Sequence, residues 1–395
     1  MSRIADETID NARRAIEAHV AAGHTPGAVA LIGRGGETHA IVAGAMAVGG
    51  GAPMRRDTIF RIASVTKPIA AALALMLVED GTIALDAPAE RWLPELADRR
   101  VLRRIDGPVA DTVPANRSIT VEDLLTFRLG WGIVFAPPGA WPIQRAIAEA
   151  GIETAFGPPD PALPFGPAEW MRRLATLPLM AQPGEAWMYT TGSSVLGVLL
   201  ARAAGRPLPE LMRERIFEPL GMPDTAFHVP PGKRDRLPAA YFPGPDGLRL
   251  TDDPAHSRWA EPPAFPAADA GLVSTVDDLH RFSRFLLDGG VAGGRRLLRE
   301  ASVAAMTTDH LTAAQREGGV AILGPDHGWG YGLAVALRTT AAGAPAGAYG
   351  WNGGSGTSWV ADPASGTTAI LLTQTSLVSP DPPAIHRDFW RAVFG

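Results

Sequence analysis

The sequence contains no cysteine among its 395 residues. This absence excludes disulfide bonds, a thiolate nucleophile and any metal site with cysteine ligands. The nine histidines are scattered, and no two of them stand four positions apart, as a helical zinc site requires. We therefore expect no metal ion.

Basic clusters and long apolar runs are also missing. The chain carries 36 basic and 41 acidic side chains, a formal charge of −5, so we expect no nucleic-acid partner and no anionic membrane surface. The longest apolar stretch, Pro68–Val78, is too short to cross a bilayer. The first 20 residues carry charges throughout and lack the apolar core of a signal peptide, so the expected location is the cytoplasm. The expected partner is a small molecule, and the sequence leaves the oligomeric state open.

Strand and helix patterns divide the chain into three parts. Two β-forming runs, Gly27–Ile32 and His39–Gly44, flank a glycine-rich turn and predict a hairpin. The β pattern returns after residue 289, with strands expected at Gly332–Leu337, Ala346–Trp351, Thr357–Ala361 and Thr367–Thr373. Helices are expected at Ile4–Ala22, Ser64–Glu79, Val121–Thr126, Pro167–Ala175, Ser194–Ala204, Leu208–Phe217 and Pro383–Phe394.

This order predicts an α+β fold, an α/β sandwich with two lobes. Residues 1–83 and 288–395 should form a discontinuous lobe, in which helices flank an antiparallel sheet. Residues 84–287 should form an inserted, mostly helical lobe. A chain of this length exceeds what one hydrophobic core usually supports, so we expect each lobe to have its own core. We expect the functional site between the lobes.

The segment Phe60–Pro68 carries a serine and a lysine three positions apart, at the start of an apolar helix. This spacing puts Ser64 and Lys67 on one helix face, and the free N–H groups of the first turn favour developing negative charge there. Serine needs a base to become a nucleophile, and a lysine amine can be that base where burial disfavours its charged form. Pro68 is tolerated only in a first helical turn, which places Ser64 at the helix start.

The spacing alone does not establish catalysis, because a serine at a helix start is usually just an N-cap. Two other catalytic or binding motifs can be excluded by inspection. The sequence has no Gly-x-Ser-x-Gly, so the nucleophile elbow of α/β-hydrolases is missing. Its glycine-rich stretches contain no Gly-x-x-x-x-Gly-Lys, so they do not form a phosphate-binding loop.

Taken with the rest of the chain, this motif resembles the serine β-lactamase-like family, most closely class C β-lactamases and the related family VIII carboxylesterases. The likeness covers nearly the whole chain. Its pieces are individually weak but specific in their order and spacing: Phe60–Ile83, Ile119–Gly130, Gln182–Gly205, Phe217–Asp224, Gly271–Gly290 and Trp351–Pro363. The resemblance implies the β-lactamase/transpeptidase-like fold and a nucleophile at Ser64.

A tyrosine supplies the second element of the resemblance. In the family, a Tyr-x-Asn segment places a phenol beside the nucleophile as a general base or proton relay, and Tyr189 matches the tyrosine. Taken alone, Tyr189 would more simply be a buried tyrosine with a satisfied hydroxyl. Thr191 stands where the family has asparagine, and one hydroxyl cannot reproduce the paired donors and the carbonyl of a carboxamide. Thr191 is therefore a candidate substrate contact that departs from the family pattern.

The third element is the segment Gly350–Trp359, where β-lactamases carry Lys-Thr-Gly on a strand. Taken alone, this segment predicts a glycine-rich turn. The resemblance implies an oxyanion hole from the N–H groups of Ser64 and Gly354. It also makes four further residues of this segment candidate substrate contacts: Trp351, Asn352, Gly353 and Ser355.

Trp351 replaces the family's lysine, and an indole cannot pair with a substrate carboxylate. Substrates with an acidic group should be disfavoured, and small neutral esters should be preferred. Loop aromatics can line such a pocket, although each is more often ordinary packing. Trp131 and Phe135 are the first candidates, followed by Trp141, Phe156, Phe165 and Trp259.

The sequence therefore predicts a serine carboxylesterase with Ser64, Lys67 and Tyr189 as catalytic residues. Such an enzyme needs no organic cofactor, and we expect none. Three alternatives remain open. The same acyl-enzyme can serve a hydrolase of β-lactams or D-amino-acid peptides, or an acyltransferase in which an alcohol replaces water. The third alternative is a binding or sensor module that has kept the fold but lost turnover.

Overall fold

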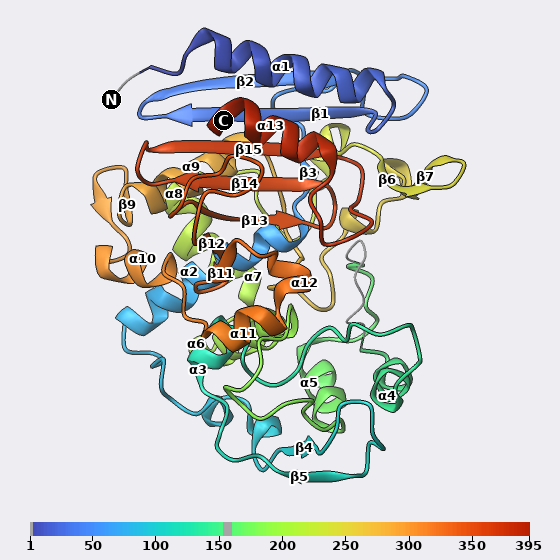
Figure 1. Cartoon of the computed structure of the whole chain (residues 1–395), viewed down its shortest axis with the longest axis vertical. Coiled ribbons are helices and arrows are strands. Elements are labelled where there is room, and N and C mark those ends of the chain that lie inside the picture. Colours follow the sequence, from blue (N-terminus) through green and yellow to red (C-terminus); the bar gives the residue numbers. More distant parts are fainter. Residues whose placement is uncertain (1–2, 153–159) are drawn as a thin grey trace.

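The computed structural model describes residues 3–152 and 160–395, and a seven-stranded antiparallel sheet forms its upper half in Figure 1. The strand order is β11-β12-β13-β14-β15-β1-β2, so the N-terminal hairpin joins the C-terminal strands through the β1–β15 pair. The strands are β1 (Gly27–Arg34), β2 (Glu37–Gly44), β11 (His327–Trp329), β12 (Ala334–Ala336), β13 (Tyr349–Gly353), β14 (Thr357–Asp362) and β15 (Thr367–Thr373).

Helices cover both faces of this sheet. On one face α1 (Asp6–Ala21) and α13 (Ala384–Phe394) pack against each other and against the sheet, and α9 (Val276–Leu287) packs on the other face. Because both faces are covered, all seven residues of β15 are buried, and its sequence is a continuous run rather than an alternating one. The predicted lobe boundary at residue 287 put α9 in the helical lobe, whereas the structure packs it on the sheet.

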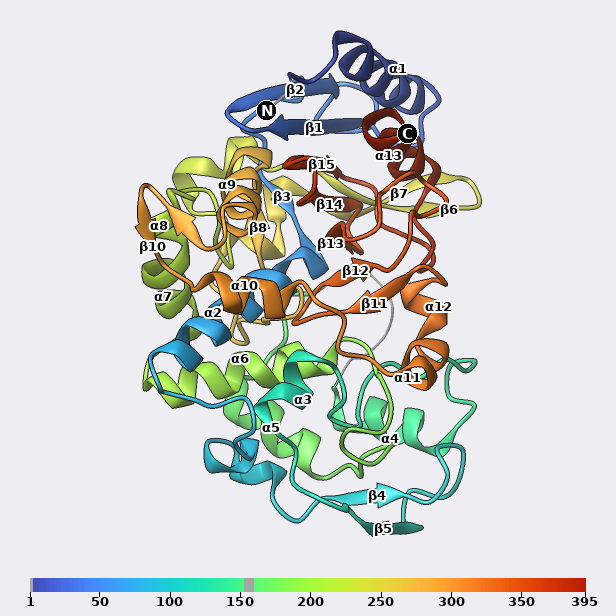
Figure 2. The ribbon, with the colours of Figure 1, turned by 60° about the vertical axis from the view of Figure 1, so that its left-hand side comes forward.

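The lower half of the molecule consists mainly of helices (Figures 1 and 2). The remaining helices are α2 (Thr66–Glu79), α3 (Val121–Leu125), α4 (Pro142–Ala150), α5 (Pro167–Ala175), α6 (Thr191–Ala204), α7 (Leu208–Met212), α8 (Glu218–Leu220), α10 (Glu300–Met306), α11 (Ala313–Gly318) and α12 (Val320–Leu323). Four short strand pairs complete the fold: β3 (Phe60–Arg61) with β8 (Val273–Ser274), β4 (Arg100–Leu102) with β5 (Thr112–Pro114), β6 (Ala240–Gly244) with β7 (Gly247–Asp252), and β9 (Val291–Ala292) with β10 (Arg295–Arg296).

The main elements expected from the sequence are confirmed, with small shifts at their ends. The hairpin β1–β2, the strands β12 to β15 and the helices α1, α5 and α13 are present. The helix expected from Ser64 begins as a 3-10 turn, Ala63–Val65, and continues as α2. The helix expected at Leu208–Phe217 is α-helical only to Met212 and then π-helical. The sequence did not predict α4, α10, α11, α12 or β11.

The two halves share one hydrophobic core. The largest cluster of buried apolar side chains includes Leu31 of β1 and Trp359 of β14, runs along α2, and reaches Leu199 of α6. A smaller cluster lies between the sheet and the helices α1 and α13. The expectation of a separate core in each lobe was therefore wrong, because α2 is buried between the lobes and belongs to both.

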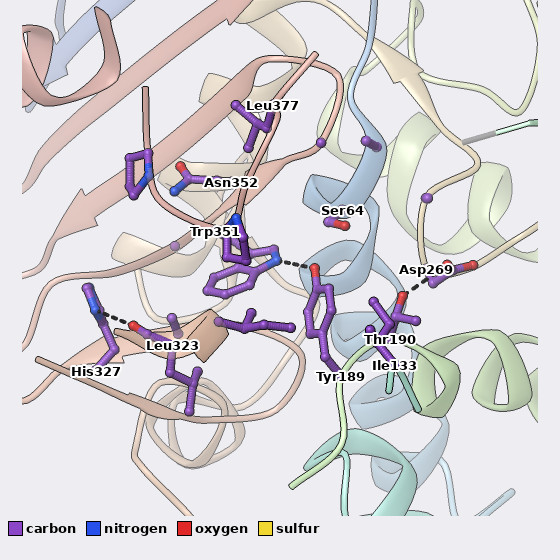
Figure 3. Close-up of a pocket in the computed structure, with 18 of the residues that line it drawn as sticks. Ser64, Ile133, Tyr189, Thr190, Asp269, Leu323, His327, Trp351, Asn352 and Leu377 are labelled. Carbon is purple, nitrogen blue, oxygen red and sulfur yellow. Dashed lines mark hydrogen bonds between the residues drawn. The ribbon is translucent and has the colours of Figure 1, made fainter. Parts of the chain in front are cut away.

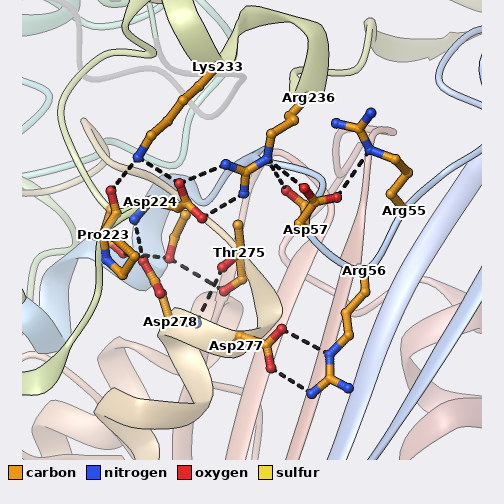
Figure 4. Close-up of polar contacts among 12 residues, drawn as sticks. Arg55, Arg56, Asp57, Pro223, Asp224, Lys233, Arg236, Thr275, Asp277 and Asp278 are labelled. Carbon is orange, nitrogen blue, oxygen red and sulfur yellow. Dashed lines mark hydrogen bonds and ion pairs between the residues drawn. The ribbon is translucent and has the colours of Figure 1, made fainter.

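A polar network anchors the segment that leads into β3 (Figure 4). Asp224 accepts hydrogen bonds from the Arg236 guanidinium at 2.9 and 2.6 Å, and its backbone N–H donates to Asp278 at the start of α9. The Arg236 side chain also forms an ion pair with Asp57 at 3.0 Å. The backbone carbonyl of Arg236 accepts a hydrogen bond from the Ile59 N–H. The network therefore connects α9, the inserted segment and the strand that precedes Ser64.

Burial raises the pKa of Asp278 to about 6, because its side chain is only 1% exposed. A carboxyl group with a raised pKa stabilises the folded state fully below its unfolded value of 3.8 and loses that contribution as the pH rises through 6. We expect Asp278→Asn to remove this dependence. From pH 4 to pH 7.5, the free energy of unfolding of the wild type should fall by roughly 2–3 kcal/mol relative to the variant. Urea unfolding of both proteins across this range measures the difference, and a difference independent of pH would contradict the assignment.

Candidate active site

The turn before α2 holds Ser64 against the end of the sheet. The Thr357 hydroxyl donates a hydrogen bond of 3.0 Å to the Ile62 carbonyl, which ties β14 to this turn. At Gly353, an added Cβ would lie only 2.3 Å from the same carbonyl oxygen, so only glycine allows this close approach. The β13–β14 turn, which includes Gly354, therefore lies next to the start of the Ser64 helix.

Lys67 is fully buried one helical turn after Ser64. Its Nζ donates hydrogen bonds to Ser64 Oγ at 2.8 Å and to the backbone oxygen of Asp269 at 2.7 Å. These two contacts fix the amine beneath the serine hydroxyl. The predicted serine–lysine pair is thus present as a direct contact.

Tyr189 reaches the same place from the segment before α6. Its ring centroid lies 4.7 Å from Lys67 Nζ, and Tyr189 and Ser64 line the same cavity. Three aromatic rings hold the phenol in position: Trp187 of the same segment at 5.8 Å between centroids, and Phe127 and Trp329 of two other segments at 5.8 and 6.3 Å. The structure therefore brings Ser64, Lys67 and Tyr189 together.

Trp351 contacts the phenol directly. Its indole Nε1 donates a hydrogen bond of 2.6 Å to the Tyr189 oxygen (Figure 3). An indole N–H can only donate a hydrogen bond, so the phenol oxygen of Tyr189 is the acceptor in this contact. The phenol proton is therefore free to be donated to another acceptor. The residue that replaces the family's lysine thus supports the proposed proton relay, a role that the sequence analysis did not foresee.

Backbone strain is concentrated around these residues. The described residues include four non-glycine residues with a positive φ, and three of them adjoin the site: Ala63 (φ 43°), Phe127 (φ 59°) and Thr190 (φ 83°). Ala63 directly precedes Ser64, and Thr190 directly follows Tyr189. Conformations of this kind cost free energy and persist where the surrounding structure imposes them, typically at functional sites.

Ser64 and Tyr189 face a cavity of about 810 Å³ (Figure 3). Apolar side chains from both halves of the molecule form most of its wall: Ile133, Ile152, Leu163, Trp170, Phe265, Ile322, Leu323, Trp359, Leu377 and Trp390. A mainly apolar cavity of this size, with polar groups at separate points of its wall, suits a small organic substrate.

Only some of the other predicted substrate contacts and oxyanion-hole residues line this cavity. Trp351, Asn352 and Gly354 line the cavity, whereas Gly353 and Ser355 are buried and do not line it. Thr191 is buried at the start of α6, does not reach the cavity, and its hydroxyl has no partner among the described residues.

The loop aromatics predicted as pocket walls lie elsewhere. Trp131 belongs to the core, where its Nε1 donates to the Pro178 carbonyl, and Phe135 is 54% exposed. The cavity wall formed by the described residues includes neither of them, nor Trp141, Phe165 or Trp259. Phe156 lies outside the described residues. The aromatic walls are instead Trp170, Phe265, Trp359 and Trp390, which sequence reasoning missed.

Asp269 was also missed. It supplies the second acceptor for Lys67 and lines the cavity. The sequence offers one signal for it, a single acidic residue within the small-residue stretch Ala267–Gly271.

Neither a metal site nor a membrane-spanning helix occurs in the part of the chain that the structure describes. Residues 3–152 and 160–395 contain no group of three or more histidine, aspartate or glutamate side chains placed to hold a metal ion. None of the helices in these ranges combines the length and the apolar character that a membrane crossing needs.

The sheet order, the helix between the halves and the buried Ser64–Lys67 pair define the β-lactamase/transpeptidase-like fold. The Beta-lactamase family model matches residues 12–388, and the chain belongs to this family. It is therefore an enzyme of the serine β-lactamase-like class.

Two relatives and one solved structure are similar to the chain over most of its length. Esterase EstB of Burkholderia gladioli is 34% identical over 368 residues, which cover 89% of this chain and 86% of EstB. Protein Rv1367c of Mycobacterium tuberculosis (strain ATCC 25618 / H37Rv) is 39% identical over 335 residues, 82% of this chain and 79% of that protein. The structure of EstCE1, described as a hydrolase with promiscuous acyltransferase activity, superposes with a TM-score of 0.82 at 26% identity and covers 98% of this chain and 99% of EstCE1.

Loss of the Tyr189 hydroxyl should lower kcat more than loss of the Trp351 N–H that donates to it. Tyr189→Phe should lower kcat by more than about a hundredfold, since it abolishes a proton-transfer group. Trp351→Phe keeps the aromatic packing but loses the hydrogen bond, and should lower kcat by about tenfold. Steady-state kinetics with p-nitrophenyl butyrate measures both. A Trp351→Phe enzyme with unchanged kcat would show that the indole only packs against the phenol.

Proposed function

We propose that the protein is a carboxylesterase that cleaves small neutral esters through an acyl-enzyme on Ser64. The observation that carries this proposal is the 2.8 Å contact between Lys67 Nζ and Ser64 Oγ at the wall of an apolar cavity. Such a contact links a nucleophile to its base, and the buried position of Lys67 keeps water away from the amine.

In the proposed reaction, Ser64 Oγ attacks the ester carbonyl. When Lys67 is neutral, the same short contact runs from the serine hydroxyl to the amine, so the proton passes to the pair formed by Lys67 and Tyr189. The N–H groups of Ser64 and Gly354 stabilise the oxyanion of the tetrahedral intermediate. The proton then returns to the leaving alkoxide, and water attacks the acyl-enzyme with help from the same base.

The cavity wall supports an ester substrate without a carboxylate. Trp351 offers no positive charge at the position where the family's β-lactamases have lysine, and its N–H is already used by Tyr189. The apolar walls stabilise an alkyl or aryl group by burial. Hydrolysis of β-lactams or of peptides with a free carboxylate is therefore the weaker alternative. The relatives EstB and EstCE1, which are called an esterase and a hydrolase, also support ester cleavage.

Ser64→Ala should abolish hydrolysis of p-nitrophenyl butyrate, because no other side chain can form the acyl-enzyme in this scheme. Release of p-nitrophenol, followed by absorbance, measures this activity. Ser118→Ala is a matched control, since Ser118 lies outside the cavity wall, where it donates to Glu90. Retained turnover in the Ser64 variant would remove the mechanism.

The second candidate is an acyltransferase, and the size of the cavity favours it. A volume of about 810 Å³ can hold an acyl group together with an acceptor alcohol, and EstCE1 is described as having promiscuous acyltransferase activity. We expect butyric acid to be the main product when p-nitrophenyl butyrate is cleaved in the presence of butanol. Mass spectrometry of the products measures the partition, and butyl butyrate as the main product would favour the acyltransferase.

A further inference from the structure

We propose that Asp269 makes the cavity selective for esters that carry an ammonium group, over uncharged esters of the same shape. This inference rests on the proposed esterase function and extends its substrate class. It concerns a side chain for which the proposed mechanism has no use, since Lys67 contacts only the backbone oxygen of Asp269.

Asp269 lies beside the nucleophile. It is half-buried and lines the cavity, and its backbone oxygen lies 2.7 Å from the amine that contacts Ser64. In Figure 3, Ser64 lies between Trp351 on one side and Asp269 with Thr190 on the other. A group bound next to the scissile ester on that side would meet the carboxylate.

The Asp269 carboxylate has room for a cationic partner. Its Oδ2 accepts a hydrogen bond of 3.2 Å from the Thr190 hydroxyl, the one donor that the described residues supply to it. By contrast, two other acids of the cavity wall have arginine partners: Asp160 pairs with Arg258, and Asp326 pairs with Arg338. A half-buried carboxylate is stabilised by an opposite charge, and here a substrate can provide it.

The remaining charged groups of the wall do not compensate Asp269. Burial lowers the pKa of His327, so its imidazole is neutral near pH 7. Arg387 of α13 is exposed and donates to the Pro382 carbonyl, and Asp381 in the same region is also exposed. Lys67 donates to Ser64 and to the backbone oxygen of Asp269 rather than to the carboxylate. The Asp269 carboxylate therefore remains available to attract a cationic ester and to repel an anionic one.

Two aromatic rings of the same cavity suit the same ligand. Phe265 lies four residues before Asp269 and stacks on Trp170, with centroids 5.2 Å apart, and both rings line the cavity. Aromatic faces attract ammonium groups through the ring quadrupole, and quaternary or substituted ammonium ions most often bind in such surroundings. A cavity that is lined by both a carboxylate and aromatic rings thus favours an ammonium group attached to an apolar stem.

Two pairs of isosteric esters test the proposal, because the ammonium group can belong to the acyl part or to the alcohol part. The acyl pair is p-nitrophenyl 3-aminopropanoate and p-nitrophenyl butyrate. The alcohol pair is butyrylthiocholine and S-(3,3-dimethylbutyl) thiobutyrate. In at least one pair, the wild-type kcat/KM should be about tenfold or more higher for the cationic ester. This ratio should fall as the ionic strength rises, since salt screens the attraction.

Asp269→Asn should bring the ratio close to one, because the amide keeps an acceptor for Thr190 but loses the charge. Asp326→Asn is the matched control, since it removes a charge from another part of the wall and should leave the ratio unchanged. If Asp269→Asn does not fold, the proposal is tested on the wild type alone: the kcat/KM ratio of cationic to uncharged ester should fall as the ionic strength rises.

Ratios of one or less in both pairs, or a ratio unaffected by Asp269→Asn, would overturn the inference while leaving the esterase function in place. Failure to cleave all four esters would instead overturn the proposed function and this inference with it.

Discussion

The hydrogen bond between Ser64 and Lys67 is the contact on which the rest of the site depends. It exists because two residues three positions apart share one face at the start of α2, and because α2 is buried between the two halves of the molecule. A buried lysine must have polar partners, and the only ones within its reach in the described structure are the serine hydroxyl and the Asp269 carbonyl. The fold therefore places the amine within hydrogen-bond distance of the Ser64 hydroxyl before any substrate binds.

The surrounding structure holds this pair in place. Thr357 and Gly353 hold the end of the sheet in contact with the turn that carries Ser64. The aromatic rings of Phe127 and Trp329, which pack on each other and on Tyr189, fix the position of the phenol. Positive φ angles at Ala63 and Thr190 show that the backbone on both sides of the site is held against its local preference. Preorganisation of this kind lowers the cost of reaching the transition state, since few groups must move.

Sequence reasoning could predict the elements whose pattern is local. The central strands are continuous β-forming runs bounded by turns, and the spacing of Ser64 and Lys67 is sufficient to predict their contact. Short helices such as α4 and α11 were not predictable, because segments of this length are stabilised by tertiary contacts rather than by propensity. The hydrogen bond from Trp351 to Tyr189 joins residues 162 positions apart, and composition gives no sign of it. Trp131 could not be distinguished from a pocket aromatic, because core and pocket walls are built from the same types of side chain.

Peptide mapping by mass spectrometry after reaction with a fluorophosphonate probe tests the central claim most directly. The account predicts a single adduct on the peptide that contains Ser64, formed much more slowly when Lys67 is replaced by methionine, which cannot accept the proton. An adduct on another residue, or equal labelling of Ser64 without Lys67, would contradict it.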